Sequence, residues 1–313
     1  MSPAPASQWN LPELLRDIPS RKVFGKSLAS YTSLRIGGPV DALVRVDDLE
    51  VLKRVLAVAN RHEIPLSVLG GGSNVLIRDS GIRGILLMMS GAFRSYRLQP
   101  NADGNTANLK VGAGYSLSRL AMQVGRRGWS GLEFAYGIPG TVGGAMVMNS
   151  GTGLGEVSDA LLSARVLCRN GELRDVPASA AGLGYRASAF PQRAILLEAT
   201  MRLRRGNAAT INSTMRGAYG RRRQTQPLAL PSAGSTFTNP QGWAAGQLIE
   251  RLGLKGTCFG GAQISPLHAN FITNIARATA ADVEALIGFV RDRVKEAYGI
   301  SLTREVRILG EKG

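Results

Sequence analysis

The sequence is poor in the residues that most often carry out chemistry without a cofactor. Only two cysteines, Cys168 and Cys258, and two histidines, His62 and His268, occur in 313 residues. The cysteines lie far apart without partners at metal-ligand spacing, so we predict no disulfide framework and no metal site. His62 ends a predicted surface helix, and no His-Glu-x-x-His motif, histidine cluster or Ser-His-Asp triad is found. A demanding reaction in this chain therefore indicates an organic cofactor.

Long apolar runs and nucleic-acid-binding motifs are also missing. No run of about 18 apolar residues occurs, and the amino-terminal residues have no apolar signal region, so we predict a cytoplasmic protein with no membrane partner. The formal charge is +16, but aromatic residues make up only 6%, and no RRM, zinc-finger or zipper pattern is found. We interpret the charge as surface charge and expect no nucleic-acid partner. A basic nucleic-acid-binding protein remains the non-catalytic alternative.

Glycine, by contrast, occurs in clusters among small and apolar residues. The longest cluster spans residues 137–153, and another, Gly70-Gly71-Gly72-Ser73-Asn74, directly follows an apolar strand predicted at 66–69. Glycine lets main-chain N–H groups approach a ligand closely, and successive N–H groups in one concavity bind phosphate oxygens. A third cluster, residues 112–114, fails as a Rossmann fingerprint because Leu117 stands where glycine is needed. We predict a dinucleotide such as FAD on a different fold; a buried structural turn is the alternative for residues 137–153.

The length of 313 residues suggests two domains, and the irregular alternation of expected strands and helices predicts an α+β protein. Residues 1–22 are predicted to form a loose arm, and the composition changes again near residue 206. Helices are expected from about residue 48, after an N-cap at Ser116, from about residue 242, and after a capping box at Thr279-x-x-Asp282. Strands are expected at residues 42–46, 66–69, 85–88, 109–111, 161–176, 194–204, 271–274 and 305–309.

Seven short motifs, taken in order, resemble the UDP-N-acetylenolpyruvoylglucosamine reductase family. They lie at residues 31–38, 70–76, 132–151, 184–188, 221–227, 234–240 and 305–310. The resemblance implies a PCMH-type FAD-binding domain at 23–205, in subdomains 23–95 and 96–205, and a smaller α+β substrate-binding domain at 206–313. It implies NADPH-driven, FAD-dependent reduction of the enolpyruvyl group of UDP-N-acetylglucosamine enolpyruvate in peptidoglycan precursor synthesis. Another FAD oxidoreductase on the same fold is the alternative.

The resemblance implies three catalytic residues, and each suits the chemistry. Negative charge develops next to the substrate carboxylate, where the permanent guanidinium of Arg186 is a suitable partner. The hydroxyl of Ser235, on a glycine turn, can protonate a strongly basic carbanion. The carboxyl of Glu305 can hydrogen-bond the developing acid or orient Ser235. Exposed surface positions are the alternative for Arg186 and Glu305.

The resemblance also implies the binding residues. NADPH and the UDP-sugar are expected to use one cleft of a monomer. The chain passes directly from Arg186 to Phe190, so it resembles the shorter form of the family, which lacks a tyrosine-bearing insertion; Arg221, Gln224 and Gln263 are candidates to cover the UDP group. The predicted substrate-binding residues are Tyr185, Asn239, Arg221 and Gln263, and the predicted cofactor-binding residues are Tyr31, Arg35, Gly70, Gly71, Gly72, Ser73, Asn74, Gly137, Ile138, Gly140, Thr141 and Gly144.

Overall fold

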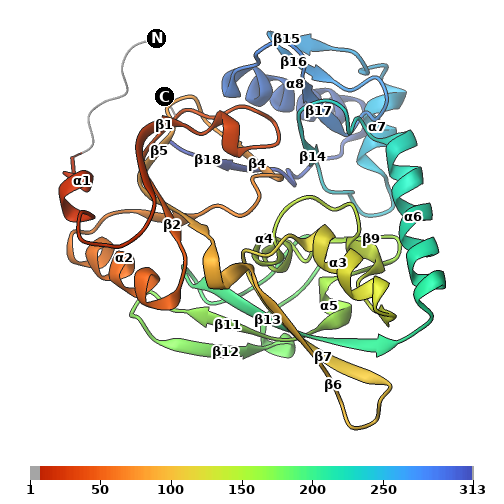
Figure 1. Ribbon diagram of the computed structural model, residues 1–313. Coiled ribbons are helices and arrows are strands. Elements are labelled where there is room, and N and C mark those ends of the chain that lie inside the picture. The colour runs from red at the N-terminus through yellow and green to blue at the C-terminus, as the bar shows by residue number, and fades with distance from the viewer. Residues whose placement is uncertain (1–7, 312–313) are drawn as a thin grey trace.

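The amino-terminal segment builds a four-stranded sheet with helix α2 packed against it (Figure 1). In the computed structural model, which describes residues 8–311, the strand order is β1-β2-β5-β3. β2 and β3 run parallel to β5, whereas β1 is antiparallel to β2. α2 begins where predicted, because the Asp48 carboxylate accepts a hydrogen bond from the Val51 N–H (2.8 Å). The bounds are β1 Lys22–Ser27, β2 Pro39–Val46, α2 Leu49–Arg61, β3 Leu66–Val68 and β5 Ile82–Met89.

The prediction of a loose arm over residues 1–22 is wrong for the part of it that the structure describes. Residues 1–7 lie outside the described residues, and a short helix, α1 (Leu11–Leu14), follows. Leu11, Leu15 and Ile18 are buried in the same apolar cluster as the inner face of α2. Their spacing is that of one helical face, but it is too short to stand out from sequence beside the neighbouring prolines and serines.

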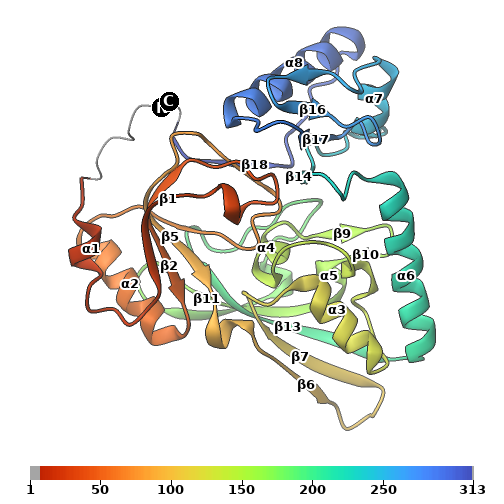
Figure 2. The same ribbon diagram turned by 45° about the horizontal axis from the view of Figure 1, so that its top comes forward.

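The second sheet is larger and carries helices on one face (Figures 1 and 2). Its order is β12-β11-β13-β7-β6, and β8 also pairs with β13. The strand predicted at 161–176 is in fact a hairpin of β11 and β12, which turns at Gly171 (φ +85°). The bounds are β6 Tyr96–Pro100, β7 Thr106–Gly112, α3 Leu117–Arg126, β8 Trp129–Ser130, α4 Val142–Val147, α5 Val157–Ala160, β11 Leu161–Leu167, β12 Leu173–Pro177 and β13 Ile195–Arg205.

Helix α6 (Ala208–Thr225) leads from this sheet into a smaller α+β unit. The capping box at Thr279 and Asp282 is confirmed, with both reciprocal hydrogen bonds formed (2.9 and 3.0 Å). The helix predicted from about residue 242 begins at Ala245 instead, and Trp243 stays exposed. The sheet order is β14-β17-β16-β15. The bounds are β14 Ser232–Ser235, α7 Ala245–Arg251, β15 Cys258–Phe259, β16 Ala262–Ile264, β17 Phe271–Asn274 and α8 Ala280–Tyr298.

The last strand returns to the amino-terminal half. β18 (Arg307–Leu309) runs parallel to β4 (Val75–Ile77), which directly follows the glycine cluster at 70–74. This pairing brings the segment around residue 305 next to that cluster, although the domain boundary at 205/206 itself stays a prediction. Within residues 8–311 no helix is long and apolar enough to cross a bilayer, and no three His, Cys, Asp or Glu side chains are grouped to hold a metal.

Candidate functional site

A cavity of about 380 Å³ lies between the two halves of the chain. The elements that border it, among them α4, β4, β14 and β18, converge near the centre of the molecule (Figure 1). Twelve of the predicted site residues line it: Gly70, Gly71, Gly72, Ser73, Asn74, Ile138, Gly140, Thr141, Gly144, Arg186, Ser235 and Glu305. Residues that are far apart in the sequence therefore form one concave site.

The two glycine clusters touch each other and form one wall of the cavity. A Cβ at Gly71 would lie 2.6 Å from the Cα of Gly140, and a Cβ at Gly70 would lie 2.7 Å from Thr141 Oγ1. The Ser73 hydroxyl donates to the Pro139 carbonyl oxygen across the same contact (3.1 Å). Only residues without a Cβ allow this approach of backbone to backbone, which explains the glycines at these positions.

This wall carries main-chain N–H groups that are not used within residues 8–311. Among the described residues, none of the N–H groups of residues 70–74 has a hydrogen-bond acceptor, and the same holds for the N–H groups of Gly140 and Thr141. All of these residues line the cavity. A run of unpaired N–H groups in one concavity suits the oxygens of a diphosphate. The residues present therefore fit the phosphate-bearing cofactor expected from the glycine pattern.

Arg186 lies in a loop that is tied to the second glycine cluster. Its backbone is left-handed (φ +55°), and Gly184 and Ala187 on either side exchange two hydrogen bonds of 3.1 Å. The buried Asn149 side chain donates to the Gly184 carbonyl (3.1 Å), and the Arg186 Nη2 donates to the Gly151 carbonyl (3.1 Å). These bonds fix the direction of the guanidinium, and they compensate for a backbone conformation that arginine rarely adopts.

Glu305 is the ion-pair partner of this guanidinium. Arg186 Nε donates to Glu305 Oε1 at 2.9 Å, and both side chains are largely buried. Burial raises the pKa of the Glu305 carboxyl above its ordinary value, and this exceeds the opposite effect of the charge and hydrogen bond of Arg186. The Asn74 side-chain amide donates to the Glu305 carbonyl (3.2 Å), which links the catalytic candidates to the first glycine cluster.

Ser235 ends strand β14, directly after Gly234 (φ +77°). Its backbone pairs with Phe271 of β17, which lines the same cavity. Within the described part of the chain, its hydroxyl has no hydrogen-bond partner, and so it is free to donate to a ligand. Glu305 pairs with Arg186 rather than with Ser235, so the expected orientation of Ser235 by Glu305 has no direct contact in this structure.

Four of the predicted substrate-binding and cofactor-binding residues form hydrogen bonds within the protein, away from the cavity. The exposed Tyr185 accepts a hydrogen bond from the Asn239 N–H (3.3 Å), and Asn239 Oδ1 accepts from the Ala245 N–H at the start of α7 (3.0 Å). The Gln263 side-chain amide donates to the Gly256 carbonyl, directly before the hairpin of β15 and β16. The Gly137 N–H donates to Ser118 Oγ (2.8 Å). None of these four lines the cavity, and their predicted roles stay predictions.

Three further predicted residues also lie outside the cavity lining. Tyr31 packs at the edge of a small apolar core, and its carbonyl oxygen lies so close to Gly72 that a Cβ there would clash at 2.0 Å. Arg35 is exposed with a left-handed backbone (φ +55°). Arg221 is exposed on α6. The motif at 31–38 therefore packs against the first glycine cluster and does not line the cavity. The position of Arg221 gives no geometric support for substrate binding.

Sequence reasoning also missed residues that line the cavity, among them Arg94, Arg222, Gln226 and Arg307. One signal was available for Arg222. Ile211 and Met215 are the buried residues of α6, and helical spacing from them selects Arg222 for the inner face instead of Arg221. No comparable sequence signal identifies Arg307, because its place depends on the distant pairing of β18 with β4.

Comparisons with known proteins agree with this arrangement. Residues 40–177 match the family described as FAD binding domain, and residues 226–309 match the UDP-N-acetylenolpyruvoylglucosamine reductase, C-terminal domain. The reductase of that name from Anaeromyxobacter dehalogenans (strain 2CP-C) is 45% identical over 301 residues, 95% of this chain and 89% of the relative. UDP-N-acetylenolpyruvoylglucosamine reductase 2 from Symbiobacterium thermophilum is 43% identical, with 96% of each chain covered.

The same relationship holds in three dimensions. The crystal structure of the UDP-N-acetylenolpyruvylglucosamine reductase from Thermus caldophilus superposes with a TM-score of 0.79 at 35% identity, and the match covers 93% of this chain and 99% of that one. The predicted α+β fold, with an FAD-binding domain before a smaller carboxy-terminal domain, is thereby confirmed. The chain belongs to the UDP-N-acetylenolpyruvoylglucosamine reductase family, and its amino-terminal half is an FAD-binding domain.

Proposed function

We propose that this protein uses NADPH to reduce the enolpyruvyl group of UDP-N-acetylglucosamine enolpyruvate, with Arg186, Ser235 and Glu305 as its catalytic residues. The observation that carries the proposal is the single cavity that these three side chains share with the unpaired N–H groups of residues 70–74. FAD supplies the hydride that reduces the carbon–carbon double bond when it is bound along that wall. The names of the relatives support the substrate.

The proposed role of Arg186 follows from its charge and from its partners. Addition of hydride to the enolpyruvyl carbon that is farther from the carboxylate leaves negative charge on the neighbouring carbon and on the carboxylate itself. The Arg186 guanidinium is permanently charged, and its position is fixed by Glu305 and by the Gly151 carbonyl. A cation that is fixed in advance stabilises this charge without having to reorganise during the reaction.

Ser235 and Glu305 are proposed to take part in protonation of the substrate carbanion. The hydroxyl of Ser235 has no acceptor among the described residues, so it can donate its proton to the carbanion carbon. Serine is a weak acid, and this transfer is feasible because a carbanion is a much stronger base. Glu305 holds Arg186 in place, and its raised pKa lets the carboxyl retain a proton at higher pH than an ordinary glutamate. In its protonated form this carboxyl is a proton donor within the same cavity, without a direct contact to Ser235 in this structure.

The experiment that tests this function is a two-step stopped-flow measurement on the FAD-loaded protein. NADPH alone should bleach the visible flavin band, and the UDP-enolpyruvyl sugar should then restore it much faster than oxygen does. Rapid restoration by oxygen, without a response to the UDP-sugar, would instead favour the alternative of another FAD oxidoreductase on this fold. Use of one cleft by both ligands, the monomeric state and the cytoplasmic location stay predictions.

A further inference from the structure

Three consecutive arginines end helix α6, but they differ in their surroundings. Arg221 and Arg223 are exposed, whereas Arg222 is half-buried and lines the cavity. α6 runs along one side of the molecule from the large sheet to the carboxy-terminal unit (Figure 1). Arg222 is therefore the cation that the last turn of this helix directs into the site.

The guanidinium of Arg222 is only partly satisfied by the protein. Its Nε donates to Gln226 Oε1 (3.2 Å), and Gln226 also lines the cavity. Its Nη1 is fully buried and has no hydrogen-bond partner among the described residues, which also offer no carboxylate within ion-pair distance. Burial accordingly lowers the pKa of Arg222 from its ordinary value. Because the guanidinium lines the cavity and only its Nε is bonded within the described residues, it is suited to bind an anion that enters the cavity.

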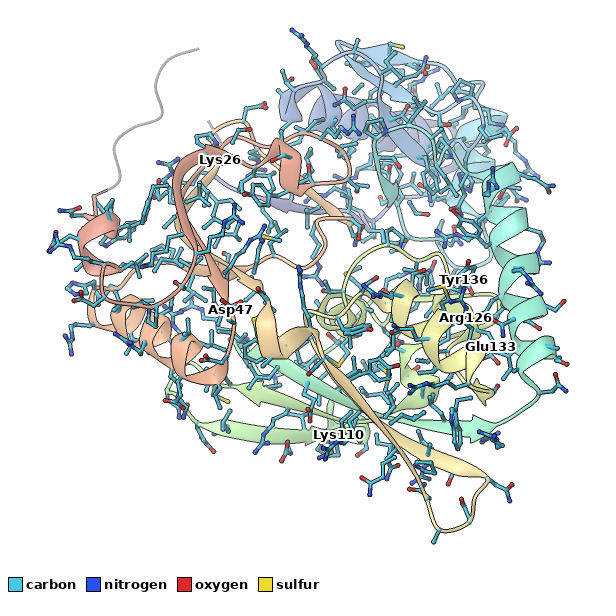
Figure 3. All side chains as sticks on the ribbon, viewed as in Figure 1. Lys26, Asp47, Lys110, Arg126, Glu133 and Tyr136 are labelled. Atoms are coloured by element: carbon cyan, nitrogen blue, oxygen red, sulfur yellow. The ribbon has the colours of Figure 1, made fainter. Side chains whose placement is uncertain are left out.

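The surroundings of Arg222 are built to hold this side chain in place. Tyr219, one turn earlier on α6, packs edge-on against Tyr136 with ring centroids 5.5 Å apart. Figure 3 shows Tyr136 next to α6. A Cβ at Gly137 would lie 2.5 Å from the Tyr219 ring and 3.3 Å from Arg222 Nη1. Gly137 therefore makes room for the tyrosine and the guanidinium, and it lies outside the lining of the cavity.

We propose that Arg222 binds the diphosphate of the nucleotide that enters the cavity next to FAD. This inference rests on the proposed function, because that function places UDP-sugar and NADPH at the site. The FAD diphosphate already has a matching set of donors in the N–H groups of residues 70–74, Gly140 and Thr141. Arg222 comes from a different element, four residues before the first residue of the carboxy-terminal match at 226. Its planar fork suits two phosphate oxygens at once.

The test compares Arg222→Gln with Arg223→Gln, a matched variant one residue away that is exposed and lies outside the cavity lining. The oxidised FAD-loaded proteins are titrated with UDP and, in a second arm, with NADP⁺, by calorimetry. Loss of a charged hydrogen bond predicts about 10- to 150-fold weaker binding for Arg222→Gln. FAD content after purification should equal that of the wild type, and Arg223→Gln should bind both nucleotides normally. Weakening in one arm or in both identifies which nucleotide uses the arginine.

Two results would overturn the inference. One is unchanged binding of both nucleotides to Arg222→Gln; the other is loss of FAD with normal nucleotide binding, which would assign Arg222 to the cofactor. If Arg222→Gln does not fold, Arg222→Lys keeps the charge but loses the fork, and it should still weaken binding relative to wild type. Failure of the proposed function is a separate result, because the wild-type protein would then bind no FAD or leave the UDP-enolpyruvyl sugar unreduced.

Discussion

The contact between the two glycine clusters can be tested with a single methyl group. In Gly71→Ala the new Cβ would lie 2.6 Å from the Gly140 Cα and 3.3 to 3.4 Å from the Gly140 carbonyl carbon and nitrogen. Every clashing atom is backbone, so no side-chain rotation can relieve the overlap. Because Gly71 does not have a positive φ, alanine adds no backbone strain of its own, and the entire effect comes from separating the two loops.

The expected size follows from the cost of overpacking. Forcing an extra methyl group into a packed contact typically costs about 1–3 kcal/mol. If the loops move apart only when FAD is absent, this energy appears as about 5- to 150-fold weaker FAD binding. If they move apart in both states, it appears as a lower melting temperature of the FAD-free protein. Gly153→Ala is the matched control, because its Cβ would meet no atom within 4 Å and its φ is not positive.

The assay is a titration of FAD-free protein, followed by the quenching of flavin fluorescence, together with thermal unfolding of the same FAD-free samples. Gly153→Ala should match the wild type in both measurements. The reasoning would be refuted if Gly71→Ala also matched the wild type in both, because the clusters would then not form a wall in backbone contact. A weakened Gly153→Ala would show that any substitution in these clusters is harmful, whatever its contacts.

Three further predictions concern the site. Ser235→Ala should leave flavin reduction by NADPH fast but slow reoxidation by the UDP-sugar by about 10²- to 10⁴-fold in stopped-flow measurements; equal losses in both half-reactions would argue against a proton donor. Arg186→Gln should raise the pH at which Glu305 titrates, because it removes the charge and the hydrogen bond that lower the pKa of this carboxyl and leaves only the effect of burial, which raises it. Infrared difference spectra, with Glu305→Gln to assign the carboxyl band, measure this titration; an unchanged or lower titration pH would contradict the prediction. Gly140→Val should lose FAD during purification, because valine is strained at φ +110° and its Cβ would lie 2.8 Å from Ser73 Oγ; a fully loaded protein would contradict this.

The sequence predicts best where the cause is local. The N-caps at Ser116 and Thr279 are predictable because a side chain accepts a free N–H three residues later in the chain, and the helix start near Asp48 has the same cause. The inner face of α6 is hard to predict, although the spacing from Ile211 and Met215 contains it, because three consecutive arginines place the same residue type on the inner and the outer face. The hairpin of β11 and β12 was missed because apolar residues continue on both sides of its turn. For α6 and for the hairpin, the sequence holds only a short signal: two apolar residues that mark the inner face of the helix, and one glycine that marks the turn.

Other features depend on contacts between distant parts of the chain and have no local signal. The return of β18 to β4 places Glu305 beside Asn74, at a sequence separation of 231 residues. Asn239 was assigned to the substrate through the family pattern, but its side-chain oxygen accepts the Ala245 N–H at the start of a helix. A short motif records that a residue type is needed at a position. It does not distinguish a ligand contact from a cap.

The glycines illustrate why this distinction needs the structure. Gly71 and Gly137 both belong to clusters interpreted as phosphate loops, and both positions exclude a Cβ. At Gly71 the excluding atoms are backbone, and the N–H has no acceptor among the described residues, so the position is suited to a ligand. At Gly137 the excluding atoms are the Tyr219 ring and Arg222, and the N–H is already bonded to Ser118. A glycine pattern therefore indicates positions where a Cβ does not fit. Whether the adjacent N–H groups are hydrogen-bonded within the protein then shows whether the position suits a phosphate or makes room for a side chain.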